Sequence, residues 1–139
     1  MSGGSAQLAE ALQAEGGLLA GALHAAVREA TPADEALLEP IPPGPYALTL
    51  AAVREGYLLH YAQGNVVDVA GDPDLALLGG DRLYALAVAE LAALGDLDAV
   101  AALAELISDC ARAHADGEPA QAVAAWERAV PAVVRNRTR

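Results

Sequence analysis

Few side chains of this sequence combine a reactive type with a spacing that chemistry could use. Cys110 and His114 are four residues apart in a stretch with helical periodicity, so one helix face would carry both. A thiolate and an imidazole at that spacing could share a metal ion, but further ligands are needed and the other histidines are only His24 and His60. We therefore expect no metal site. Cys110 would be a buried structural thiol, and His114 would stabilise the C-terminal end of its helix.

The sequence also lacks the patterns that serve nucleophilic catalysis and phosphate binding. No Gly-x-Ser-x-Gly turn occurs, and the pair Gly79-Gly80 is followed by Asp81 in a chain without any lysine. Glu105 and Asp109 have a spacing that metal ligands use, yet acids on the outer face of a helix are ordinary in an acidic chain. We expect neither catalytic residues nor a cofactor. The polar aromatic side chains that could point into a pocket are Tyr57, His60, Tyr61, Tyr84 and His114.

The charge of the chain excludes two classes of partner. Acidic residues outnumber basic residues by 19 to 8, and the formal net charge is −11. Such a chain lacks the positive field that a nucleic-acid backbone or an anionic membrane surface requires. Half of the arginines fall near the C-terminus, where they could contact an acidic partner or interact with a helix dipole: Arg128, Arg135, Arg137 and Arg139.

Length and composition are those of one folded domain. The chain has 139 residues, of which 55% are hydrophobic, and its single cysteine excludes an internal disulfide. The N-terminus shows no basic segment followed by an apolar core, and no stretch of about 20 apolar residues runs without a charge. We expect a cytoplasmic protein without a transmembrane segment.

Caps and breakers divide the helical periodicity into about five helices. The expected helices cover residues 5–29, 46–63, 72–95, 96–117 and 118–131, with a short helical turn over 31–38. Gly16-Gly17 could split the first helix, Leu97 would face inward, and Pro131 would kink or end the last helix. A Pro-rich bend covers 39–45, and residues 1–4 and 135–139 should be frayed. The expected fold class is all-α, a single domain over residues 1–139 built as an antiparallel helical bundle.

One segment resembles a known enzyme family. Residues 77–87 read Leu-Leu-Gly-Gly-Asp-Arg-Leu-Tyr-Ala-Leu-Ala, and this run is similar to the Gly-Asp segment that opens a core helix of the trans-polyprenyl diphosphate synthases. The resemblance covers residues 58–121, from the step at Gly64-Asn65 to Gly117-Glu118 and Gln121. It implies a fold that is isoprenoid-synthase-like in part.

The chain departs from that family where the family performs its chemistry. The synthases resembled here hold Mg²⁺ with two Asp-Asp-x-x-Asp motifs, which bridge the metal to a diphosphate, and they bind a second diphosphate with Lys and Arg. This sequence has no adjacent Asp pair and no Lys, and the segment around Tyr57, His60 and Tyr61 offers no carboxylate where the first motif would lie. The resemblance therefore implies a relative that is not an enzyme.

Three hypotheses for the function follow. The first is a non-catalytic accessory or regulatory subunit, similar to the small component of heteromeric polyprenyl (heptaprenyl) diphosphate synthases, with a catalytic synthase subunit as partner. The second is a helical adaptor or structural subunit of another assembly, which could self-associate as a dimer. The third is a protein that binds an isoprenoid or another small apolar ligand. The candidate pocket or interface residues are Tyr57, His60, Tyr61, Gly79, Gly80, Asp81, Tyr84 and His114.

Overall fold

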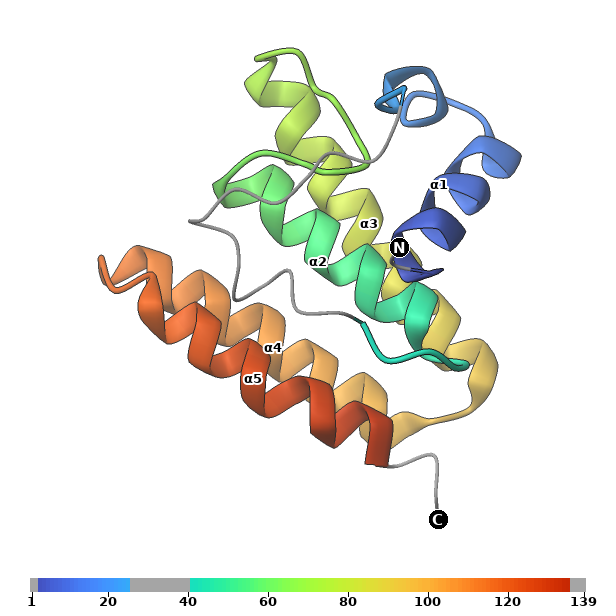
Figure 1. The fold of residues 1–139 in the computed structure, drawn as a ribbon. Coiled ribbons are helices and arrows are strands. Elements are labelled where there is room, and N and C mark those ends of the chain that lie inside the picture. Colours follow the sequence, from blue (N-terminus) through green and yellow to red (C-terminus); the bar gives the residue numbers. More distant parts are fainter. Residues whose placement is uncertain (1–2, 26–40, 136–139) are drawn as a thin grey trace. The chain divides into compact units, whose positions relative to one another are not determined.

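The structure, a computed structural model, describes residues 3–25 and 41–135, and this part of the chain is mainly helical (Figure 1). The elements are α1 (Gly3–Glu15), a short 3-10 helix η1 (Ala20–Ala22), α2 (Ala47–Tyr61), α3 (Pro73–Leu94), α4 (Leu97–Ala115) and α5 (Ala120–Arg135). Within these residues the only extended pairing is one antiparallel bridge, between Leu23 and Val67. The all-α fold class is thus confirmed for the described residues.

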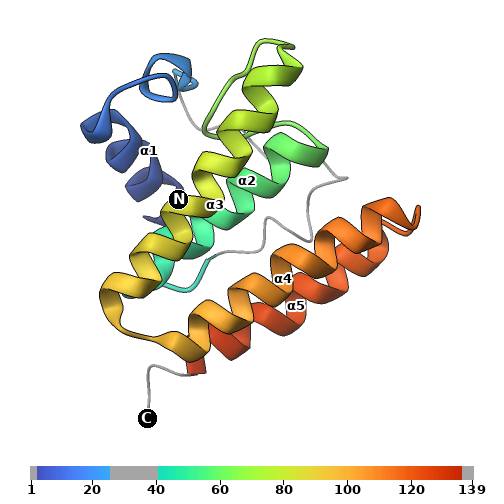
Figure 2. The same cartoon turned by 180° about the vertical axis from the view of Figure 1, so that it is seen from behind.

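Backbone contacts divide the chain into two compact units, Met1–Ala87 and Val88–Arg139. The first unit holds α1, η1, α2 and the larger part of α3. The second holds the end of α3 together with α4 and α5 (Figure 2). The expectation of a single domain over residues 1–139 stays a prediction.

The first helix is shorter than the sequence predicts. It was expected over residues 5–29, but α1 ends at Glu15 because Gly16 and Gly17 take φ values of 73° and 81°. This left-handed conformation costs glycine little and cannot continue an α-helix. At its other end α1 begins at Gly3, within the segment 1–4 for which fraying was expected. The helical turn expected over 31–38 lies outside the described residues.

Helix α2 forms the centre of the first unit. Every residue from 49 to 59 is buried, including the charged side chains of Arg54 and Glu55. α1 lies against α2 and contributes the fully buried Leu8 and Leu12 (Figure 1). Arg54 Nη2 donates a hydrogen bond of 2.9 Å to Ser5 Oγ, so a polar contact inside the core joins the two helices. In the described part of the expected Pro-rich bend, residues 41–45 are not helical.

Helices α2 and α3 approach closely at two glycines. A Cβ atom on Gly56 would lie 2.8 Å from the Tyr84 ring and 3.1 Å from Gly80 O. A Cβ atom on Gly80 would overlap the imidazole of His60. Gly80 therefore allows the two helices to approach closely at this point.

The helix starts predicted at residues 72 and 96 are confirmed, and each is capped by an aspartate side chain. Asp72 Oδ1 accepts hydrogen bonds from Asp74 N at 3.0 Å and from Leu75 N at 3.2 Å, at the beginning of α3. Asp96 Oδ1 accepts from Ala99 N at 2.9 Å, at the beginning of α4. Each cap satisfies backbone donors that a helix leaves free in its first turn.

The second unit is built on the contact between α4 and α5. Buried residues follow helical spacing on both: Ala99, Leu103, Leu106, Cys110 and Ala113 on α4, and Ala122, Ala125, Trp126, Ala129 and Val133 on α5. One detail of the sequence prediction is wrong: Leu97 was expected to face inward but is 76% exposed, because the buried stripe begins at Ala99. Of the two outcomes expected at Pro131, an end of the helix does not occur, since α5 continues to Arg135. No described helix is both long enough and apolar enough to cross a membrane.

The close approach at Gly80 predicts an unequal effect of two neighbouring substitutions. Gly80→Ala should destabilise the chain by about 1–3 kcal/mol, because the new methyl group meets an imidazole stacked between helices. Gly79→Ala is the matched control on the same helix turn, since its Cβ would meet only the ends of Leu59 and Leu19, at 3.1 and 3.2 Å. Urea unfolding of both variants measures the difference. Equal stabilities would contradict the described crossing.

Candidate functional site

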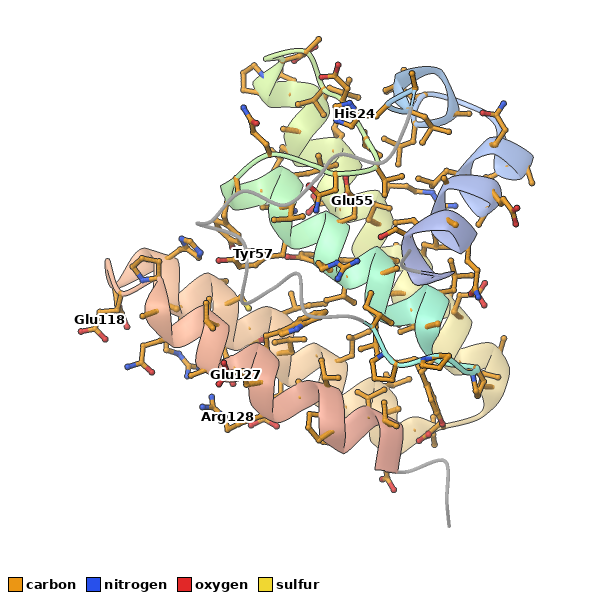
Figure 3. All side chains as sticks on the ribbon, viewed as in Figure 1. His24, Glu55, Tyr57, Glu118, Glu127 and Arg128 are labelled. Carbon is orange, nitrogen blue, oxygen red and sulfur yellow. The ribbon has the colours of Figure 1, made fainter. Side chains whose placement is uncertain are left out.

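The first unit contains a buried carboxylate with three backbone partners. Glu55, in the middle of α2, is 2% exposed. Its Oε1 accepts a hydrogen bond from Asn65 N at 2.9 Å, and its Oε2 accepts from Val66 N and Val67 N, both at 3.0 Å. The loop after α2 is therefore folded over one side chain of the helix that precedes it (Figure 3).

Burial and hydrogen bonding act in opposite directions on this carboxyl group. Burial raises the pKa of Glu55 above its ordinary value and is the largest influence on it. The three backbone N–H groups and the neighbouring Arg54 favour the ionised form and limit that rise in pKa. Burial also lowers the pKa of Arg54, while Glu55 opposes that change. Each of these two adjacent buried groups has polar partners, which are three backbone N–H groups for Glu55 and Ser5 Oγ for Arg54.

The loop held by Glu55 in turn holds the segment around His24. His24 N donates to Val66 O at 2.8 Å, and Asp68 N donates to Ala22 O at 2.7 Å. The side chain of His24 also reaches the loop, with Nε2 at 3.1 Å from Gly64 O (Figure 3). A continuous series of hydrogen bonds therefore runs from Glu55 through the loop to residues 22–24.

A groove lies between the start of this N-terminal segment and the first turns of α3. It has a volume of about 310 Å³. Leu18 is 69% exposed on one wall and Leu78 is 62% exposed on the other, while Leu19 is buried. The charged groups Glu15 and Arg82 also line the groove and form an ion pair with each other. The remaining lining residues are Gly16, Gly17, Leu75 and Gly79.

The α2–α3 crossing brings together most of the candidate residues predicted from the sequence. His60 stacks on Tyr84, with ring centroids 5.3 Å apart and planes 19° apart. His60 Nε2 lies 3.2 Å from Asp81 Oδ1, near enough for an ion pair when the imidazole is protonated, although no hydrogen bond forms there. The Tyr57 and Tyr61 rings are 5.0 Å apart, and the His60 and Tyr61 rings are 5.8 Å apart. Six of the eight predicted residues form this cluster, namely Tyr57, His60, Tyr61, Gly80, Asp81 and Tyr84, whereas Gly79 lines the groove instead.

The eighth candidate, His114, lies in the second unit, in the last turn of α4. One turn earlier Cys110 is buried, and burial together with Asp109 raises the pKa of its thiol to about 11. The thiol is therefore almost entirely protonated at neutral pH and is a poor nucleophile and metal ligand. Among the described residues, no three His, Cys, Asp or Glu side chains stand together as metal ligands would. Of the predicted C-terminal arginine cluster, only Arg128 has a described side chain; it lines a hollow with Asp109, Arg112 and Glu118.

Sequence reasoning missed Glu55 and the groove. A signal for Glu55 was present, because Arg54 and Glu55 are the only Arg, Lys, Asp or Glu residues in the otherwise apolar α2. The apolar periodicity of α2 indicates its leucines as core residues and gives no indication of Glu55. The groove had no local signal, since its two walls come from residues about 60 positions apart in the chain.

The bonding of Glu55 predicts that an uncharged isostere cannot replace it. Glu55→Gln should destabilise the chain by about 1–3 kcal/mol, because an amide NH₂ replaces one acceptor oxygen and leaves at least one buried backbone N–H without a partner. Glu127→Gln, at an exposed position of α5 (Figure 3), is the control and should have little effect. Chemical denaturation of the two variants measures both values. A Glu55→Gln variant as stable as the control would contradict the bonding described.

The direction of the Glu55 pKa shift predicts a pH dependence. Because the pKa in the folded chain is above the ordinary 4.5, the folded state holds this proton more tightly than the unfolded state does. Stability from Glu55 is therefore fully present below pH 4.5 and declines as pH rises through the raised pKa. The wild-type advantage over Glu55→Gln should grow as pH falls from 7 toward 4.5, measured by urea unfolding. An advantage that shrinks on acidification would show that the N–H bonds outweigh burial.

Comparison of the chain with models of protein families, with curated proteins and with solved structures gives no match. The likeness to the polyprenyl diphosphate synthases consequently rests on the residues of segment 58–121 alone.

Proposed function

We propose that this protein is a non-catalytic helical subunit that works by packing against a partner protein, and that the partner is a catalytic polyprenyl diphosphate synthase. The observation that carries the proposal is the pair of exposed leucines, Leu18 and Leu78, on the two walls of one groove. Exposed leucines that line the same hollow mark a surface suited to a partner, whereas single ones are common on any protein.

The contacts of the segment that resembles the synthases support a structural role for it. Gly80 lies at the α2–α3 crossing, and Asp81, the acidic residue of the Gly-Asp pattern, lies beside His60. Gly79 and Arg82 line the groove. The segment thus contributes to helix packing and to the surface of the groove. Both roles are suited to a non-catalytic subunit.

A second function, binding of a small apolar ligand such as an isoprenoid, is favoured by the volume of the groove. At about 310 Å³ it stands at the lower end of the range of small-molecule sites, roughly 300–1,000 Å³. A role as adaptor in an unrelated assembly would use the same exposed leucines. The identity of the bound molecule separates these functions.

The test is purification of the tagged full-length chain from its natural cells, followed by native mass spectrometry and an isoprenyl chain-elongation assay. We expect a stoichiometric complex with a protein that carries two Asp-Asp-x-x-Asp motifs, and elongation only when that partner is present. The same tag on an unrelated acidic protein is the control. A partner without these motifs, a chain that carries only a small ligand, or elongation by the chain alone would each contradict the proposal.

A further inference from the structure

The groove has the geometry of a binding site for a helix. Leu75, Leu78, Gly79 and Arg82 follow the steps i, i+3, i+4 and i+7, so one face of α3 forms a wall. Leu18 and Leu19 form the opposite wall. Apolar side chains repeated at helical spacing on an incoming segment would fit between such walls, which is the usual way a groove receives an amphipathic helix.

The opposite wall is fixed before any partner arrives. Gly16 and Gly17 turn the chain out of α1, and the side chain of Leu19 is only 7% exposed. Farther along, residues 22–24 are held by the loop that Glu55 organises. A groove with both walls already in place loses little conformational freedom on binding, which favours affinity.

Charge determines which kind of segment fits. Asp72 and Asp74 are exposed at the start of α3, and Asp74 precedes Leu78 by one helix turn. Arg82, the basic residue of the groove, is already paired with Glu15. The charges of the lining therefore balance, and the negative charge near the groove comes from Asp72 and Asp74 at the start of α3, within a chain of net charge −11. A second copy of this chain would bring the same negative charge, so a basic partner is complementary and self-association is not.

We propose that the groove between residues 16–19 and the first turns of α3 binds an amphipathic helical segment of the partner protein, with apolar residues between Leu18 and Leu78 and flanking Lys or Arg residues near Asp72 and Asp74 at the start of α3. This inference rests on the proposed function and names the surface that would perform it. It specifies the bound segment by its chemistry and is independent of the partner's enzymatic class.

The first test uses synthetic peptides on the full-length chain, followed by NMR. The probe is a leucine–lysine amphipathic helical peptide, and the matched control is a leucine–glutamate peptide with the same leucine spacing. Binding of the lysine peptide should shift the amide signals of Gly16, Gly17 and Gly79, which line the groove, and leave those of Gly95 and Gly117 in place. The glutamate peptide should not bind.

Variants distinguish groove binding from general attraction between opposite charges. The double substitution Leu18→Ser with Leu78→Ser keeps the net charge. It should weaken binding of the lysine peptide by at least about tenfold, because two apolar contacts are removed. Leu97→Ser alters a leucine that is 76% exposed outside the groove and should change affinity less than about twofold. Equal effects of the two variants, signal changes away from the groove, or a homodimer that forms through these leucines would overturn the inference.

The same variants in the tagged chain separate this inference from the proposed function. If a synthase co-purifies with the wild-type chain and with Leu97→Ser, but not with the double variant, both proposals hold. If it co-purifies with all three chains, the groove proposal fails and the proposed function stands. If the lysine peptide binds in the groove but the natural partner is not a synthase, the groove proposal stands and the proposed function fails.

Discussion

The carboxylate of Glu55 is the interaction on which the arrangement of the first unit depends. The backbone N–H groups of Asn65, Val66 and Val67 are buried with their residues, and donors in such a place need acceptors. Glu55 provides both oxygens to them. The loop fixed in this way then pairs with residues 22–24, which follow directly on the groove wall at residues 16–19. A carboxyl group at the centre of one helix is thus linked through hydrogen bonds to a segment distant in the sequence.

Small residues make room for this polar core. A Cβ atom on Gly64 would overlap the Glu55 carboxylate, so only glycine at position 64 leaves room for that side chain. At the α2–α3 crossing, Gly56 and Gly80 leave space for the Tyr84 ring and the His60 imidazole respectively. With no Phe and only one Trp, the chain packs mainly through Ala, Leu and Val, and close backbone approach at glycines takes the place of large aromatic side chains.

Local signals predicted much of the fold, and contacts distant in sequence escaped prediction. The aspartates at 72 and 96 fixed the starts of α3 and α4 because a cap acts within one helix turn. The end of α1 was misjudged, since a Gly-Gly pair can either loosen a helix or end it, and only the positive φ values decide. His60, Asp81 and Tyr84 were singled out by residue type as pocket or interface candidates, which stays a prediction, whereas neither their contacts with one another nor the groove was predicted. The walls of the groove come from distant parts of the chain, and the loop bonds that hold residues 22–24 use backbone atoms, which carry no sequence signature.

Amide hydrogen exchange measures most directly whether Glu55 organises this region. In the wild-type chain the amides of Asn65, Val66 and Val67, together with those of His24 and Asp68, should exchange slowly, because all five take part in the described hydrogen bonds. In Glu55→Gln these amides should lose protection together, while those in the middle of α4 and α5 keep theirs. Unchanged protection of the loop and of His24 in that variant would contradict the central role given to the carboxylate.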